Sequence, residues 1–138
     1  MKLRNLRRYS SGYTLVEVML VVATIALLAS IAMPSIFRSR KRAQATRILE
    51  DLRMIDSAMQ LYAMENRCTG SEIIVAADAP KLKKYIKTNS ALFNSLPNDI
   101  LGNPFTFGPL NQHPRVSQAT FDNFAEVAPS DFWSPFNP

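Results

Sequence analysis

Cysteine, histidine and glycine are scarce in this chain of 138 residues, which has one cysteine, one histidine and four glycines. The lone Cys68 excludes an intrachain disulfide, and the lone His113 leaves no Cys/His cluster for zinc. No Ser/His/Asp set, HExxH motif or glycine-rich phosphate loop stands out in the sequence. We therefore expect no enzymatic activity, no cofactor and no catalytic residue.

Charge is missing from a long stretch near the N-terminus. Between Arg8 and Arg38 the only charged residue is Glu17, and residues 18–37 form an uncharged apolar run. As a helix, this run is about 30 Å long, which is enough to cross the hydrocarbon core of a bilayer. This run excludes an ordinary cytosolic globular protein as the default and predicts a transmembrane helix.

The net charge of +5 does not indicate a nucleic-acid partner. Four basic residues lie in the first twelve positions, and the remainder of the chain has twelve basic against eleven acidic residues. The basic balance is therefore mostly a property of the N-terminal tip.

The sequence divides into four parts: a basic segment (1–12), an apolar segment (13–37), an amphipathic helix (38–67) and a C-terminal head (71–138). Apolar residues in the third part step by three and four, which places them on one helical face. These residues are Ala45, Ile48, Leu52, Ile55, Met59 and Tyr62. We predict one long helix from Tyr13 to about Arg67, with a kink at Pro34 and with Gly70 just past its C-terminal end.

The head has a different composition, with recurrent proline and glycine between short apolar runs. Helices are predicted over 78–86 and 90–96, and short strands around 105–107 and 115–117. So short a segment has few residues for a core of its own, so we expect it to pack on the apolar face of the long helix. The predicted fold class is α+β: one long N-terminal helix packed on a small head with short helices and a small antiparallel sheet.

Glu17 is the unusual residue of the apolar segment, because a carboxylate at the centre of a bilayer costs about 2.5–3.5 kcal/mol. If the chain is cut after Gly12, a new amine appears on Tyr13, and Glu17 lies four residues later on the same helical face. Glu17 can then neutralise that amine, or the amine of a neighbouring copy. The alternative is a tolerated charge that reaches water near the membrane interface.

The segment GYTLVEVMLVVATIALLASIAMPS resembles the N-terminus of type IV prepilins and type II secretion pseudopilins. That family has a basic leader ending in glycine, a hydrophobic residue that becomes the methylated N-terminus, a glutamate four residues later, and often a proline about twenty residues in. Here these positions are Gly12, Tyr13, Glu17 and Pro34. Tyr13 departs from the usual Phe or Met. The lone Cys68 departs from pilins that close a disulfide loop, which favours a pseudopilin.

The resemblance implies that a prepilin peptidase removes residues 1–12 and methylates Tyr13. It also implies that mature chains stack with copies of themselves or with other pilin-like subunits, using an inner-membrane assembly platform. The chain would then be a single-pass protein of the inner membrane with its head outside the cytoplasm, and later part of a periplasmic or surface filament. Basic residues flank the apolar run on both sides, so charge alone does not decide this orientation.

Two further features allow more than one interpretation. The basic cluster at residues 38–42 can dock on anionic lipid headgroups, or it can be an ordinary interfacial anchor with solvated charges. The segment 102–105 (Gly-Asn-Pro-Phe) resembles the entry to the small sheet of major pseudopilins, but its residue types also suit a plain turn. Those pseudopilins can bind calcium, and Asp122, Glu126 and Asp131 are acids available here. Their spacing matches no calcium loop, so we expect no metal site.

We therefore expect a structural subunit of a type II secretion pseudopilus or of a type IV pilus-like filament. One alternative within the family is an adhesive or motility pilin. An alternative of a different class is a secreted binding module with an ordinary signal peptide cleaved near Ala32, because residues 29–32 resemble a small-residue cleavage site. Glu17 and the helical pattern that continues beyond Pro34 speak against that module.

Overall fold

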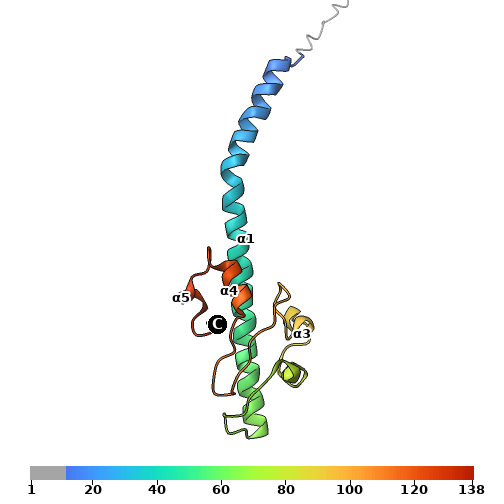
Figure 1. Cartoon of the computed structure of the whole chain (residues 1–138). Helices are drawn as coiled ribbons and strands as arrows, with labels where there is room; N and C mark the ends of the chain where they lie inside the picture. The colour runs from blue at the N-terminus through green and yellow to red at the C-terminus, as the bar shows by residue number, and fades with distance from the viewer. Residues whose placement is uncertain (1–11) are drawn as a thin grey trace, which may run out of the picture. The chain divides into compact units, whose positions relative to one another are not determined.

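The computed structural model describes residues 12–138, so all of the predicted leader except Gly12 lies outside the described residues. The chain divides into two compact units, the first ending at Phe37 and the second covering Arg38–Pro138. Helix α1 (Leu15–Asn66) has 52 residues and belongs to both units (Figure 1). It confirms the long helix predicted from the sequence.

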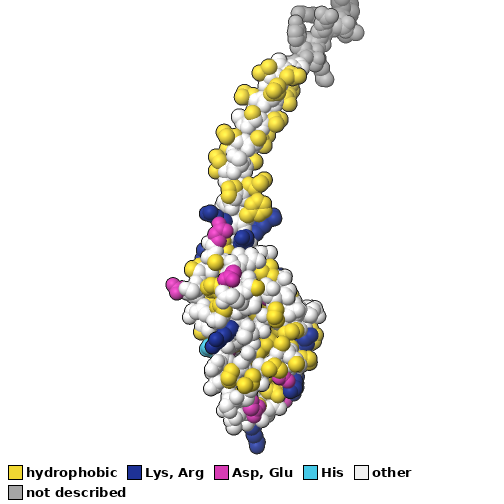
Figure 2. Space-filling view, in the orientation of Figure 1, with side chains coloured by type: hydrophobic (Ala, Val, Ile, Leu, Met, Phe, Trp, Pro, Cys, Tyr) yellow, Lys and Arg dark blue, Asp and Glu magenta, His cyan; other side chains and the backbone are white. Residues whose placement is uncertain are grey.

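The first unit contains the apolar part of α1. Its large side chains are exposed, and Figure 2 shows hydrophobic side chains along the visible face of this part. By length and composition α1 contains one stretch able to cross a membrane. Pro34 lies inside α1, which is continuous through it. The kink at Pro34 stays a prediction.

After α1 the second unit is built from short helical elements. They are η1 (Ala76–Asp78), α2 (Ala79–Leu82), η2 (Lys83–Tyr85), α3 (Ala91–Ser95), α4 (Gln118–Phe124) and α5 (Ser130–Trp133). The helix predicted over 78–86 is thus a series of short turns, and the one predicted over 90–96 is α3. Ser90 begins α3 as its N-cap, because the Ser90 hydroxyl oxygen accepts the N–H of Phe93 at 3.2 Å.

The small antiparallel sheet is present only as isolated bridges, and residues 12–138 contain no named strand. The antiparallel bridges join Ile73 to Pro109, Asn98 to Pro104, and Thr106 to Arg115. The last of these joins the two predicted strands through two backbone hydrogen bonds of 2.9 and 2.8 Å. Proline has no N–H to donate, so Pro104 and Pro109 limit how far a ladder can extend. A full sheet stays a prediction.

The core of the second unit is shared between α1 and the head. The predicted stripe is buried from Ala45 to Met59, and Tyr62 packs against it half-buried. From the head, Phe124, Val116 and Trp133 are fully buried, and Phe136 is buried as well. Trp133 and Phe136, from the aromatic C-terminal tail of the head, thus belong to the core. In Figure 1, α3, α4 and α5 lie along this part of α1.

The C-terminal end of α1 differs from the prediction. The residue directly after the helix is Arg67, which has left-handed backbone with φ of 54°, while Gly70, with φ of 83°, lies three residues further on. The N–H of Cys68 donates to the carbonyl of Ala63 at 3.0 Å, and the N–H of Arg67 donates to that of Met64 at 3.4 Å. This pair of bonds is a Schellman motif, which satisfies carbonyls left free at the end of the helix.

Candidate functional site

The predicted cleavage segment lies immediately before α1, in non-helical backbone. Gly12 and Tyr13 are both exposed, and the Tyr13 side chain is 84% exposed. Among residues 12–138, a Cβ added to Gly12 would meet nothing within 4 Å. Among the described residues, the peptide bond between Gly12 and Tyr13 is thus accessible from outside the chain.

Thr14 and Glu17 form reciprocal contacts at the start of α1. The N–H of Glu17 donates to the Thr14 hydroxyl oxygen at 3.2 Å, and the Glu17 carboxylate accepts the N–H of Thr14 at 3.4 Å. This is the arrangement of a capping box, in which the first and fourth residues satisfy each other's backbone donors. Sequence reasoning missed Thr14, although the pattern Thr-x-x-Glu before an apolar run is the known signature of such a box.

The capping box fixes the direction in which the Glu17 carboxylate points. That carboxylate faces the backbone of Thr14, one residue from the position where cleavage would create an amine on Tyr13. Negative charge is also favoured at this end of a helix, because the helix dipole is positive there. In the uncut chain the carboxylate caps its own helix, and it lies within one turn of the predicted new N-terminus.

The apolar part of α1 offers a large surface without partners in the described chain. Between Val18 and Phe37 the large apolar side chains are about half exposed or more. Monomeric soluble proteins rarely expose contiguous apolar surface of this kind, which marks a site of contact with lipid or with other proteins. This surface and the Thr14–Glu17 box together form the candidate site.

The basic cluster at residues 38–42 has an acidic partner in the head. The Glu126 carboxylate lies 3.6 Å from the Arg38 guanidinium and 3.9 Å from the Lys41 ammonium. Figure 2 shows basic and acidic side chains gathered at the start of the second unit. All three side chains are exposed, so these ion pairs contribute little to stability. Sequence reasoning considered Glu126 only as a calcium ligand and missed this contact.

The three acids considered for calcium are not brought together by the structure. Glu126 faces the basic cluster, the Asp122 carboxylate accepts the Gln118 amide at 2.8 Å, and Asp131 is exposed in the first turn of α5. Within residues 12–138 no group of three or more His, Cys, Asp or Glu side chains is arranged to hold a metal ion.

The loop from Asp99 to Phe105 is more than a plain turn, because a buried carboxylate organises it. Asp99 accepts the backbone N–H groups of Leu101 and Asn103 at 2.8 and 2.9 Å. The hydroxyl of Thr120 in α4 donates to the same carboxylate at 2.5 Å, and the Asn103 amide donates to Thr120 at 2.9 Å. Gly102 has φ of +86°, which favours glycine. The loop therefore positions α4 against the core.

Asp51 is a second buried acid and lies on the buried face of α1. Burial raises the pKa of Asp51, Glu50 and Asp99 raise it further, and the nearby Arg47 acts in the opposite direction. The charged form of Asp51 is therefore less favoured in the folded chain than in the unfolded one.

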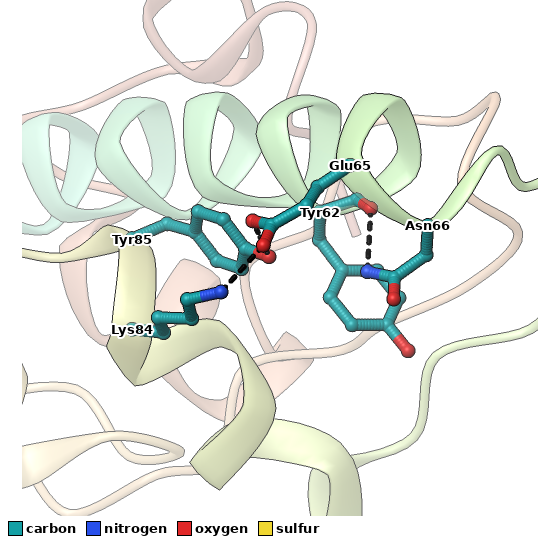
Figure 3. Close-up of polar contacts among 5 residues, drawn as sticks. All are labelled: Tyr62, Glu65, Asn66, Lys84 and Tyr85. Atoms are coloured by element: carbon teal, nitrogen blue, oxygen red, sulfur yellow. Dashed lines mark hydrogen bonds and ion pairs between the residues drawn. The ribbon is translucent and has the colours of Figure 1, made fainter.

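A polar cluster ties the end of α1 to η2 (Figure 3). The Glu65 carboxylate accepts hydrogen bonds from the Lys84 ammonium and the Tyr85 hydroxyl. The hydrogen bond from Lys84, and to a smaller extent that from Tyr85, lowers the pKa of Glu65. The same contacts raise the pKa of Lys84 and of Tyr85. The Tyr62 and Tyr85 rings pack edge to face with centroids 6.2 Å apart. The cluster therefore joins the last turns of α1 to η2 at the surface of the second unit.

The side chains of His113 and Cys68 both contact neighbouring residues of the second unit. The His113 ring nitrogen Nδ1 lies 2.9 Å from a carboxylate oxygen of Asp56 in α1, and the ring packs edge to face on Phe136. The Cys68 thiol is half-buried, and its hydrogen bond to Glu72 raises its pKa, as burial also does. A thiol with a raised pKa is less reactive than an ordinary one.

The comparisons with known proteins agree on one group of relatives. The chain is 30% identical to the type II secretion system core protein G of Pseudomonas aeruginosa over 108 residues, which cover 73% of this chain and 75% of that protein. It is 27% identical to the core protein G of Aeromonas hydrophila (72% and 73% covered) and 26% identical to that of Vibrio cholerae (72% and 71% covered). No protein-family model and no solved structure matches the chain.

Proposed function

The chain belongs to the pseudopilin family of type II secretion system core protein G, and from this membership we infer that it is a structural subunit of a type II secretion pseudopilus rather than an enzyme. Among the alternatives drawn from the sequence, this membership favours the pseudopilus over an adhesive pilin and over a secreted binding module. The chain covers about three quarters of the Pseudomonas aeruginosa relative, so the likeness is not confined to the N-terminal segment.

We propose that a prepilin peptidase cleaves the bond between Gly12 and Tyr13 and methylates the new amine on Tyr13. The observation that carries this proposal is the exposed, non-helical Gly12–Tyr13 bond directly before a capped apolar helix. A peptidase needs an accessible, non-helical backbone, which these two residues offer. The leader would then be residues 1–12, and the mature chain would begin at Tyr13.

Glu17 is proposed as the assembly residue of the mature chain. A free amine on Tyr13 and the Glu17 carboxylate have opposite charges, and both must lose water when the apolar helices stack into a filament core. Pairing within the chain or with a neighbouring copy compensates for that loss. The apolar surface of residues 18–37 would first contact lipid and then the equivalent surface of other subunits.

The proposed location follows from the same segment. One long apolar helix agrees with a membrane-anchored pseudopilin. We propose that the chain is first a single-pass protein of the inner membrane with its head outside the cytoplasm, and that it later becomes part of a periplasmic filament. Its partners would be copies of itself, other pilin-like subunits, the prepilin peptidase and the inner-membrane assembly platform.

The processing proposal is tested by mass spectrometry of the chain produced with its peptidase. We expect a chain that starts at Tyr13 and has one added methyl group. The variant Gly12→Leu should keep its leader in the membrane fraction, because the peptidase no longer accepts the bond. A mature chain that starts at Met33 would instead support a signal peptide cleaved after Ala32 and would contradict the proposal.

The assembly proposal is tested with Glu17→Ala. Membrane insertion should be retained or improved, because a charge is removed from lipid, while the yield of sheared filaments should fall. Glu50→Ala is the matched control, because Glu50 is an exposed acid further along α1. Equal filament yields from the Glu17→Ala and Glu50→Ala variants would refute a role of Glu17 in assembly.

A further inference from the structure

The contact between Glu126 and the basic cluster has a consequence for how the chain leaves the membrane. We propose that Arg38 and Lys41 bind the phosphate groups of anionic lipids while the chain is in the bilayer, and that Glu126 replaces those phosphates when the chain moves into the filament. This inference rests on the proposed function, since it assumes that the chain passes from membrane to filament.

The position of the cluster in the chain brings it to the lipid headgroups. Residues 38–42 follow directly on an uncharged run that is long enough for the bilayer core. Basic side chains at such a boundary are attracted to anionic lipids. A phosphodiester and a carboxylate both accept hydrogen bonds from guanidinium and ammonium groups, so they compete for the same two side chains.

Glu126 is held in place for this competition. It lies in the turn after α4, between the fully buried Phe124 and Ala128. The N–H groups of Val127 and Ala128 donate to the carbonyl of Phe124 at 2.9 and 2.8 Å, which fixes the backbone of the turn. The head therefore places the backbone of Glu126 so that its carboxylate reaches Arg38 and Lys41.

The two ion pairs are also weak enough to be exchanged. Their distances of 3.6 and 3.9 Å exceed those of a close charge-assisted hydrogen bond, and all three side chains remain exposed to water. Pairs of this kind are readily broken by a competing anion or by salt. Glu126 thus lowers the affinity of the basic cluster for anionic lipid. It also supplies a counter-charge to Arg38 and Lys41 once the lipid is gone.

Lipid preference is measured on the full chain in phosphatidylcholine vesicles that contain a minority of phosphatidylglycerol. Spin-labelled forms of both lipids report their relative association with the protein. We expect the wild type to prefer phosphatidylglycerol and Glu126→Gln to raise that preference about threefold to fivefold, the effect of one charge at a membrane surface. The control Glu50→Gln should leave it unchanged. Equal preference in the wild type and the Glu126→Gln variant would overturn the proposal.

Two further arms identify the groups and the source of the phosphate. In a chain that already has Arg38→Gln and Lys41→Gln, adding Glu126→Gln should no longer change the lipid preference. The two cations for which Glu126 and lipid phosphate compete are then absent. Inorganic phosphate in place of chloride, at constant ionic strength, should leave the difference between wild type and Glu126→Gln intact. If free phosphate abolishes that difference, the cluster binds a soluble anion and the lipid proposal is wrong.

The transfer of the chain from the membrane into the filament is measured by the yield of sheared filaments. Glu126→Gln should lower the yield and raise the membrane-bound fraction, and the triple variant with Arg38→Gln and Lys41→Gln should restore the yield. Absence of filaments from the wild type would refute the proposed function. Filaments from the wild type and from Glu126→Gln in equal amounts would refute only the exchange between lipid and Glu126.

Discussion

Replacing Leu52 by alanine should destabilise the head strongly, because Leu52 lies at the centre of the face that α1 shares with it. The side chain is fully buried within the core cluster. Its replacement by alanine removes three carbons, worth about 2.4 kcal/mol at roughly 0.8 kcal/mol each. The cavity left behind adds to this loss, so we expect a total of about 2.5–5 kcal/mol.

The lone tryptophan provides the assay. Trp133 is fully buried in α5, packs against Phe124, and its indole N–H donates to the carbonyl of Ala128 at 3.1 Å. Its fluorescence therefore reports unfolding of the head during a urea titration of the full chain in detergent micelles. Glu50→Ala on the exposed side of α1 is the control and should change the free energy of unfolding by about 0.5 kcal/mol or less. A loss below about 1 kcal/mol for Leu52→Ala would contradict a core that the head shares with α1.

Three other predictions concern the same unit. A fragment of residues 38–138 should unfold cooperatively in urea, whereas residues 71–138 alone should not, because they lack the α1 face; a shared midpoint would contradict this. Glu65→Gln should lower the free energy of unfolding at neutral pH. Because the pKa of Glu65 is lowered in the folded chain, this difference from wild type should disappear as the pH falls through and below the ordinary value of 4.5. A difference in the free energy of unfolding that stays constant with pH would exclude the charge as its cause. Asp51→Asn should raise stability at neutral pH, because burial raises the pKa of Asp51 and so penalises its charge, and an unchanged or lower midpoint would refute this.

The long helix could be predicted because its signals are local. Apolar side chains step by three and four between Ala45 and Tyr62, and only Pro34 interrupts the helical pattern. The end of the helix was less predictable. Arg67 adopts the left-handed conformation that glycine normally favours, because the N–H groups of Arg67 and Cys68 then reach carbonyls in the last turn. Composition alone pointed to Gly70.

The head could be predicted only in part, because its contacts join residues distant in the chain. Ser117 accepts the N–H of Thr120 and so begins α4, a cap that the sequence pattern could have suggested. The Asp99–Thr120 hydrogen bond depends instead on how the loop and α4 are brought together. The same holds for Glu126, whose partners Arg38 and Lys41 lie at the other end of the second unit's sequence.

The most direct test of the central claim is the identity of the chain in filaments sheared from cells that express it with its secretion system. We expect filaments that contain this chain, and mass spectrometry of that fraction should show an N-terminus at methylated Tyr13. Recovery of the chain only as a soluble protein starting at Met33, or only in the membrane with residues 1–12 retained, would contradict the account.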